Sequence, residues 1–364
     1  MEPIIAPVSV DLIKAELTPA KKLRDTNKSK NEIYVVTHHD SPNVMREIGR
    51  LREEAFRDSG GGSGLSMDID EFDTMEHPYK QLLVWDPEEE KILGGYRFIH
   101  GSDIKLDEKG QPLLATAHMF HFLEKFIKEY LPFTVELGRS FVAPEYQSSK
   151  AGAKALFALD NLWDGLGALA IQIPNIKYYF GKMTMYPEYN RQARDLIQHF
   201  LFKHFEDKEK LVVPTEPLVI ETDPAYMDSI LTEKEFKDDY KCLNGEVRRL
   251  GENIPPLVNA YMSLSPTMKV FGGGINHEFS EAEETGILIN FDEIYDAKIA
   301  RHVDSFINEK MTKMRKRFPL FVENMGTDLK MMITMKREQV QAKIEESMKK
   351  RKAKKASRKN SSRK

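Results

Sequence analysis

The sequence predicts an α/β protein in which a mixed β-sheet is layered with helices. Apolar runs enriched in β-branched and aromatic residues alternate along the chain with longer segments whose apolar residues recur every three or four positions. Two of these runs, 81–86 and 92–101, flank the polar turn PEEEK, a pattern typical of an antiparallel hairpin. Because helical segments separate the other runs, helices should cover the sheet.

The individual elements follow from the same patterns. In chain order, the expected strands lie at 32–38, 81–86, 92–101, 134–144 and 176–185. Helices are expected at 41–57, 117–130, 151–172 and 188–205. The first helix has clear start signals, because Ser41 can cap it and Pro42 fits its first position. Further core segments are expected at 255–264, 268–274 and 286–292.

Four parts are expected along the chain. Residues 1–30 should form an irregular N-terminal segment, and 31–294 the main domain, with the polar stretch 206–250 as an insertion or a cap. Residues 295–348 are expected to form a helical C-terminal extension, and 349–364 a disordered basic tail.

Charge is distributed unevenly along the chain. The formal net charge is −3, yet residues 330–364 contain 14 Lys and Arg against 3 Glu, so the rest of the chain is acidic. The last 16 residues contain ten basic side chains and no acid, and they cannot bury enough apolar surface to fold alone. Such a tail can adsorb to an anionic membrane, attract an acidic carrier protein, bind nucleic acid without specificity, or stay solvated. No aromatic residue interrupts the basic run, which disfavours specific nucleic-acid recognition.

The single cysteine, Cys242, excludes an internal disulfide framework and a multi-cysteine zinc site. A cytoplasmic location is therefore expected. The sequence has neither an evident export signal nor an apolar run of roughly 20 residues, so neither export nor membrane spanning is predicted. The histidines form no H-E-x-x-H motif, and no metal site is predicted.

Several short motifs occur in an order and spacing shared with a known family. The first four are LREEAFR (51–57), DIDEFD (68–73), LLVWD…ILGGYRF (82–98) and ELGRSFV (136–142). In these motifs the chain resembles the acyl-homoserine-lactone synthases, which have the Gcn5-related N-acyltransferase fold. It resembles more closely the acyl-carrier-protein-dependent N-acyltransferases of the ornithine-lipid and glycine-lipid (hemolysin-like) branch, which also share YYFGKMTM (178–185) and PPLVNAYMSL (255–264). The resemblance implies an autoinducer-synthase-like three-layer acyltransferase domain at 31–294, with a helical C-terminal extension.

The resemblance also implies a reaction. A long-chain acyl group, with or without a 3-hydroxyl, would pass from acyl carrier protein to the α-amine of a small amino acid, glycine or ornithine, and give an N-acyl amino acid lipid precursor. Such an enzyme would work in the cytoplasm and, through 349–364, at the inner face of the membrane. One alternative is an O-acyltransferase acting on a lysolipid, which the lack of an H-x-x-x-x-D motif disfavours. The other is a non-catalytic protein that binds a carrier protein or nucleic acid.

Glu136 and Arg139 lie three positions apart on the expected strand 134–144, so on a regular strand they face opposite sides. A bulge would be needed to bring them together. Amide formation requires a group that takes the proton of the amine, and Glu136 is the candidate catalytic base. The alternative is a structural carboxylate bonded to Arg97 or Arg139. Either arginine is also a candidate for holding the acceptor's carboxylate.

Further residues match the family's motifs at the entrance of the cleft. The resemblance implies that Asp70 and Asp73 pair with Arg52 and Arg97 in a buried network, and that Phe56 shapes the site beside them. The alternatives are a solvated acidic loop and an ordinary amphipathic helix surface.

The start of the helix after 134–144 departs from the acyl-CoA-binding members of the fold. Those members carry Q/R-x-x-G-x-G/A, whose backbone N–H groups hold a pyrophosphate. Here the sequence after the glutamine is SSKAGA, which keeps only one of the glycines. The resemblance implies that the phosphopantetheine arm of acyl carrier protein is bound by Phe141, Val142, Gln147, Lys150 and Gly152. Because that arm ends in a single phosphodiester, acyl carrier protein is favoured over acyl-CoA as co-substrate, and no bound cofactor is expected.

Overall fold

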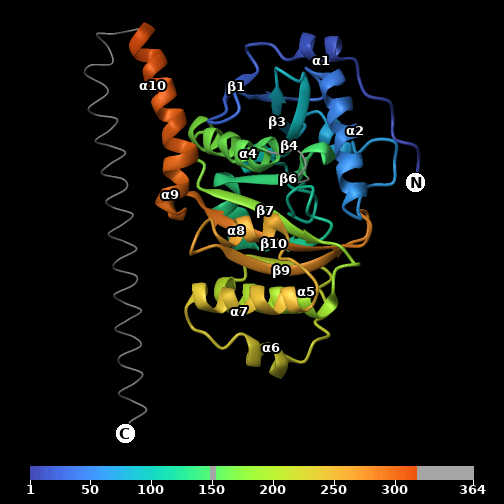
Figure 1. The fold of residues 1–364 in the computed structure, drawn as a ribbon, viewed down its shortest axis with the longest axis vertical. Coiled ribbons are helices and arrows are strands. Elements are labelled where there is room, and N and C mark those ends of the chain that lie inside the picture. Colours follow the sequence, from blue (N-terminus) through green and yellow to red (C-terminus); the bar gives the residue numbers. More distant parts are fainter. Residues whose placement is uncertain (148–152, 318–364) are drawn as a thin grey trace. The chain divides into compact units, whose positions relative to one another are not determined.

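The computed structural model describes residues 1–147 and 153–317, and the structural statements below refer to these residues. The chain divides into two compact units, 1–303 and 304–364. The first unit contains every strand and helix described below except α10 (Ser305–Arg317), which belongs to the second (Figure 1).

An eight-stranded sheet forms the centre of the first unit. Its strands follow the order β1-β2-β3-β4-β6-β7-β10-β9, and neighbours are antiparallel except for the parallel pair β6 and β7. In chain order the strands are β1 (Lys22–Asp25), β2 (Glu32–Val36), β3 (Lys80–Asp86), β4 (Lys91–His100), β6 (Thr134–Val142), β7 (Tyr178–Met185), β9 (Lys269–Asn276) and β10 (Ala282–Asn290). The expected mixed sheet is therefore present, and each predicted strand lies in it.

The parallel strands β6 and β7 pair at their first residues and then separate. Residues Thr134–Glu136 pair with Tyr178–Phe180, and no later residue of β6 pairs with β7 in the described ladders. Beyond this point β6 continues along β4 as far as Val142, while β7 continues along β10 as far as Met185. The two strands thus leave an opening in the middle of the sheet.

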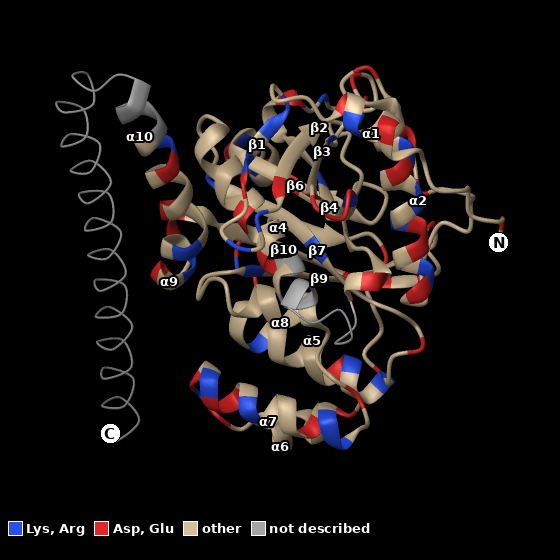
Figure 2. Cartoon of the chain, turned by 45° about the horizontal axis from the view of Figure 1, so that its top comes forward, with Lys and Arg blue, Asp and Glu red and all other residues tan. Residues whose placement is uncertain are grey.

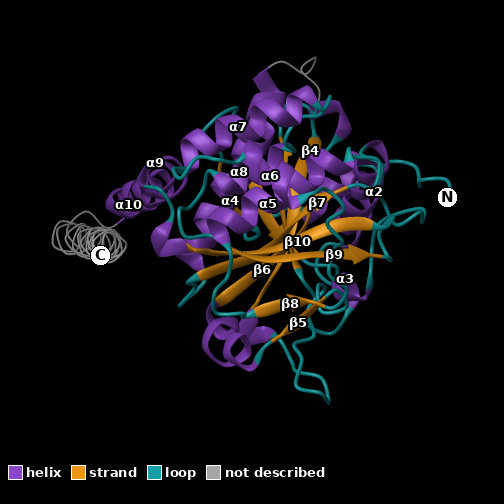
Figure 3. Cartoon of the chain, turned by 90° about the horizontal axis from the view of Figure 1, so that it is seen from below, coloured by secondary structure: helices purple, strands orange, loops and turns teal. Residues whose placement is uncertain are grey.

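The two faces of the sheet are covered differently. Helices α4 (Ala153–Gln172), α5 (Arg191–Phe205) and α7 (Phe236–Arg249) lie on one side, the helical side, and a two-stranded ribbon of β5 (Phe120–Phe122) and β8 (Val212–Pro214) lies on the other (Figure 3). Helix α2 (Pro42–Asp58) lies on the side of the ribbon, because Arg52 donates to Gln81 of β3, whereas the next residue of that strand, Leu82, lies against Gly165 of α4. A large core containing Leu82 and Met183 lies on the helical side, and a smaller aromatic core containing Phe122 and Phe180 lies under the ribbon. Neighbouring residues of one strand therefore enter different cores.

Shorter elements complete the unit. They are α1 (Val10–Glu16), α3 (Glu71–Thr74), α6 (Pro224–Ile230), α8 (Pro256–Met262), α9 (Asp296–Ile299) and two π-helical turns, Phe126–Tyr130 and Ala300–Asp304. The C-terminal extension is helical as far as Arg317, and the rest of it, together with the basic tail 349–364, lies outside the described residues.

Two expectations about the chain were wrong. The segment 1–30 is not irregular throughout, because it contains α1 and β1, and β1 forms an edge of the main sheet. The helix expected at 117–130 is instead strand β5 followed by a π-helical turn. The reason is a period of two: Phe120 and Phe122 are buried and His121 between them is exposed, which suits pairing with β8 better than one face of a helix.

Charged side chains gather on the outer helices, as the colouring of α2 and α7 shows (Figure 2). In α2, Arg50 pairs with Glu47 and Glu54 on the outer side. Charged residues on the central strands are therefore notable, and Lys182 on β7 and Glu284 on β10 are two of them.

Candidate active site

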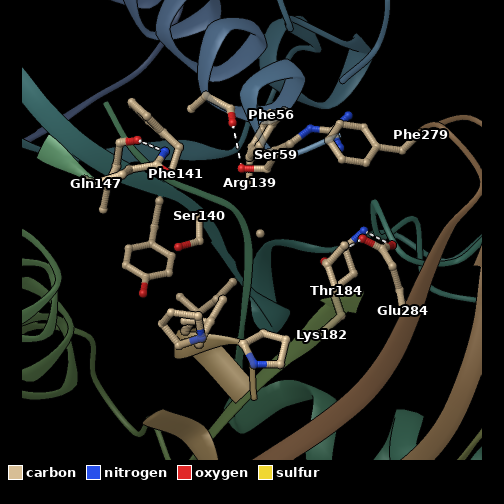
Figure 4. A pocket seen from close by; sticks show the side chains of 18 of the residues that line it. Phe56, Ser59, Arg139, Ser140, Phe141, Gln147, Lys182, Thr184, Phe279 and Glu284 are labelled. Atoms are coloured by element: carbon tan, nitrogen blue, oxygen red, sulfur yellow. Dashed lines mark hydrogen bonds and ion pairs between the residues drawn. The ribbon is translucent and has the colours of Figure 1, made fainter. Parts of the chain in front are cut away.

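A cavity of about 550 Å³ lies where β6 and β7 separate (Figure 4). All six residues of Leu137–Val142 line it, and further lining comes from the end of α2, from β7 and β10, and from α8. None of the lining residues belongs to 206–250, so this stretch does not form the expected cap over the cavity. Its helix α7 packs on α5 instead, for example through Phe236 and Phe200.

Strand β6 has a bulge at the cavity. Gly138 pairs with Arg97 and Phe141 pairs with Gly95, so two residues of β6 stand opposite one residue of β4. The first of these two, Arg139, has φ of +47°, in the left-handed region. This is the irregularity that the spacing of Glu136 and Arg139 required for a pair. The two side chains nevertheless have different partners.

Buried acids and arginines form a network behind the end of α2. The Arg52 Nη1 atom lies 3.0 Å from Asp73 Oδ2, and Arg97 Nη1 lies 2.6 Å from Asp70 Oδ2 and 3.4 Å from Asp73 Oδ2. Burial alone would raise the pKa of Asp73, but Arg52 and Arg97 hold it below its ordinary value. The structure thus contains the pairing that the motifs implied, and Asp73 does not belong to a solvated loop.

The network extends to the cavity through Arg139. Its Nε atom lies 3.0 Å from Asp68 Oδ2, its Nη2 atom lies 3.5 Å from Asp70 Oδ2, and its guanidinium stands 4.7 Å from the centre of the Phe279 ring. Phe279 also packs edge-on against Phe56. Arg139, Phe56 and Phe279 all line the cavity, whereas Arg52, Asp70, Asp73 and Arg97 do not.

Glu136 lies outside the cavity lining. Its Oε1 atom accepts a hydrogen bond of 2.6 Å from the Thr116 hydroxyl, and its Oε2 atom accepts one from the Tyr79 hydroxyl. Burial raises its pKa, although both hydroxyl groups donate to it. The partners of Glu136 are thus two hydroxyl groups and not Arg97 or Arg139. Its role as the catalytic base stays a prediction, and its side chain does not reach the cavity directly.

A polar wall of the cavity comes from β7 and β10, which the sequence reasoning did not single out. Lys182 donates to Glu284 Oε2, which also accepts from Asn276 at 3.0 Å, and the Thr184 hydroxyl donates to Glu284 Oε1 at 3.1 Å. Lys182, Thr184 and Glu284 line the cavity, and Figure 4 shows them together on one side of it. The available signal was Lys182 as the one charged residue of YYFGKMTM (178–185) and the two acids near the start of AEETGILIN (282–290).

The charges of this wall influence each other. Burial, together with the charges of Arg139 and Arg97, lowers the pKa of Lys182, although the neighbouring Glu284 raises it. Burial would raise the pKa of Glu284, but Lys182 and then Asn276 hold it below its ordinary value. Glu284 is therefore a carboxylate at neutral pH, and it lies inside the cavity.

The rest of the cavity is mainly apolar and aromatic. The side chains there include Ala55, Phe56, Tyr96, Leu137, Phe141, Val142, Leu257 and Tyr261. The cavity consequently combines a surface that an alkyl chain can contact with a charged wall.

Three of the five residues expected to bind a carrier arm, Phe141, Val142 and Gln147, line the cavity. Ala143 N donates to Leu93 O, and amides alternate in direction along an antiparallel ladder, so the amide of Val142 is directed away from β4 toward the opening. The other two, Lys150 and Gly152, lie outside the described residues.

The described residues contain no group of three or more His, Cys, Asp and Glu side chains arranged to hold a metal ion. Within 1–147 and 153–317, no helix is both long enough and apolar enough to cross a bilayer.

Comparison with known proteins agrees with this geometry. A sequence-family model of the acetyltransferase (GNAT) domain matches residues 51–156. The glycine N(alpha)-acyltransferase of Bacteroides thetaiotaomicron is 65% identical over 307 residues, covering 84% of this chain and 91% of that protein. The glycine N(alpha)-acyltransferase of Phocaeicola vulgatus is 64% identical over 315 residues, covering 86% and 97%. The chain is thus an enzyme, an N-acyltransferase with the GNAT fold. It belongs to the glycine N(alpha)-acyltransferase family.

Two solved structures are also similar over part of the chain. FeeM, an N-acyl amino acid synthase from uncultured soil microbes, covers 46% of this chain and 79% of its own, with 15% identity and a TM-score of 0.29. The AHL synthase LasI covers 42% of this chain and 72% of its own, with 17% identity and a TM-score of 0.27. These TM-scores are too low to carry an argument about this chain. The GNAT fold expected from the motifs is confirmed by the matched domain and by the family.

Proposed function

We propose that the enzyme transfers a long-chain acyl group from acyl carrier protein to the α-amine of glycine, and that the N-acylglycine formed is a lipid precursor. The observation that carries this proposal is the divided lining of the cavity, which suits an apolar acyl chain and a small charged acceptor at once. The names of the two relatives support glycine rather than ornithine as the acceptor.

The acceptor's carboxylate is assigned to Arg139. Arg97 is buried, binds Asp70 and Asp73 and does not line the cavity, so it is not available to a ligand. Arg139 lines the cavity, and a guanidinium can bind a carboxylate through two parallel hydrogen bonds. Its existing contact with Asp70 is long at 3.5 Å, which leaves donor capacity on the guanidinium.

The thioester is assigned to the opening beside β6. An amide directed into the opening, such as that of Val142, can donate to the carbonyl oxygen as negative charge develops on it. The choice of acyl carrier protein over coenzyme A rests on the sequence SSKAGA at 148–153, which keeps only one glycine of the pyrophosphate-binding pattern. Residues 148–152 of this segment lie outside the described residues.

A direct assay tests the proposal. The purified enzyme is given acyl-carrier-protein or acyl-CoA thioesters of several chain lengths, with and without a 3-hydroxyl, together with glycine, ornithine, alanine or serine. We expect thiol release and an N-acylglycine detected by mass spectrometry, with acyl carrier protein preferred at least tenfold in kcat/KM. The lack of an amide with every amino acid would refute the function, and equal use of acyl-CoA would refute the carrier alone.

We also propose that the basic tail 349–364 brings the enzyme to an anionic membrane, where its product would partition. The support is compositional, since each Lys or Arg near such a surface contributes roughly 1 kcal/mol. Deleting 349–364 should reduce cosedimentation with phosphatidylglycerol vesicles but leave kcat in solution unchanged. Vesicle binding that is not reduced by the deletion would contradict the membrane role of the tail. Binding of the full chain to nucleic acid but not to vesicles would indicate that the tail binds nucleic acid instead.

A further inference from the structure

The pair formed by Lys182 and Glu284 has a geometry that an ordinary structural ion pair does not need. Glu284 is buried, with 2% of its surface exposed, and yet its side chain lines the cavity. Its Oε2 atom is occupied by Lys182 and Asn276, whereas Oε1 has one described hydrogen bond, from the Thr184 hydroxyl. A carboxylate oxygen can accept two hydrogen bonds, so Oε1 can receive another donor from inside the cavity.

The surroundings hold Glu284 in this position. Asn276 Oδ1 accepts from the backbone amide of Glu278 at 3.2 Å and contacts His118 Nε2 at 3.1 Å, which directs the Asn276 amide group toward Glu284. Thr184 stands directly opposite Glu284 in the ladder between β7 and β10. The carboxylate is thus fixed by two strands and does not depend on a mobile loop.

We propose that Glu284 binds the α-ammonium group of the acceptor through Oε1, and that the charge of Lys182 on the same carboxylate lowers the pKa of this bound amine. The inference rests on the proposed function and identifies the subsite for the amine. Together with Arg139 for the carboxylate, it places an acidic and a basic group on the walls of one cavity, which matches the two charges of an amino acid zwitterion.

Two ammonium groups that share one carboxylate repel each other. Each therefore loses its proton more readily than it would as the single ammonium group bound to that carboxylate. The charged and titratable groups that act on the pair are Arg139 and Glu136 from β6, Arg97 from β4 and Tyr186 after β7. Two of them are further cations, which adds to the effect on a bound ammonium.

The chemical step is balanced without any additional reactant. The bound ammonium gives one proton to solvent, and the neutral nitrogen, which stays hydrogen-bonded to Glu284 Oε1, attacks the thioester carbon to form the C–N bond. When the C–S bond breaks, its electron pair remains on sulfur, and the second nitrogen proton neutralises the thiolate as the thiol leaves. The nitrogen thus loses two protons, of which one goes to sulfur and one to solvent.

The pH dependence of the reaction tests the role of Lys182. With saturating acyl donor and saturating glycine, kcat should rise with pH and level off below the pKa of the amine in solution, because kcat reports the pKa of the bound amine. Lys182→Gln should move this rise upward by about one pH unit or more, so that activity is recovered at high pH. Lys182→Arg, which keeps the charge, should stay close to wild type. Lys269→Gln is the matched control, because Lys269 pairs with Asp207 and Glu209 away from the cavity.

An acceptor of low basicity separates this role from a structural one. Aminooxyacetate carries a carboxylate and an amine that is already neutral at pH 7, so it does not need to lose a proton. The loss of activity in Lys182→Gln should shrink at least severalfold with this acceptor. An equal loss with glycine and aminooxyacetate, at every pH, would show a structural role and overturn the inference.

Glu284 is tested through the acceptor's KM. Glu284→Gln should raise KM for glycine about 10- to 100-fold and leave KM for the acyl donor within about twofold, whereas Glu284→Asp should recover part of the affinity. Glu283→Gln is the control, since Glu283 directly precedes Glu284 on β10, is buried, and binds Arg191. A wild type that forms no amide would refute the proposed function. If the wild type is active and the Glu284→Gln variant has the same KM for glycine, this inference alone would be refuted.

Discussion

The acid and arginine network behind α2 and the pair of Lys182 and Glu284 are both buried charge clusters of one molecule, but they differ in access. In the network, Arg52 and Asp73 bind each other away from the cavity, and neither lines it. Lys182 and Glu284 bind each other on the cavity wall. Burial and altered pKa values are common to both clusters, so they do not identify the reacting groups. Access to the cavity does.

If this distinction is correct, breaking the network should damage the fold more than the chemistry. In Asp73→Asn the buried Arg52 and Arg97 lose a charged partner, and we expect a loss of about 3–5 kcal/mol in the free energy of unfolding. The pKa of Asp73 is lowered in the folded protein, so its contribution is present above the unfolded value near 4 and is lost as the pH falls below it. The difference between variant and wild type should therefore narrow in acid.

Chemical denaturation at several pH values from about 2 to 8 measures this effect, because the contribution of Asp73 is lost only below about pH 4. Asp238→Asn is the control, because Asp238 and Lys241 form a pair on the surface of α7, and its removal should cost less than about 1 kcal/mol. A stable Asp73→Asn protein that cannot form the amide would contradict the comparison, because it would place the network in the chemistry.

Arg139 belongs to the network and also lines the cavity, so it sharpens the comparison. It binds Asp68 of the network and lines the cavity, so Arg139→Gln should affect stability and catalysis together. We expect KM for the amino acid to rise about 10- to 100-fold, because the charge-assisted hydrogen bonds to its carboxylate are lost. Steady-state kinetics with glycine and with glycinamide measure this, since glycinamide lacks the carboxylate and should lose little.

The control for Arg139→Gln is Arg249→Gln, because Arg249 pairs with Glu246 in an exposed position on α7. An equal loss with glycine and glycinamide would mean that Arg139 supports the fold but does not hold the carboxylate.

Much of this architecture could be predicted from the sequence because it depends on local patterns. The strands at β3, β4, β6 and β7 follow from their apolar runs, and the pairing of Asp70 with Arg97 follows from the family's motifs. Glu284 could not be found in this way. It lies about 100 residues after Lys182, and only the ladder between β7 and β10 brings the two together. A glutamate that stands beside another glutamate at the start of a strand can face solvent or the interior, and the sequence shows neither its partner nor whether a cavity lies beside it.

The site residue that the sequence favoured as base, Glu136, provides the smallest expected effect and the closest test of the comparison. Both of its carboxylate oxygens accept hydrogen bonds, and it does not line the cavity. We therefore expect Glu136→Gln to change kcat by less than about threefold. Because burial raises the pKa of Glu136, the folded wild type favours the protonated form and should gain stability as the pH falls from the folded pKa toward about 4.5. The glutamine variant should lack this gain. Kinetics at saturating glycine and denaturation at several pH values measure both quantities, and a hundredfold loss of kcat in a folded Glu136→Gln protein would return the role of base to Glu136.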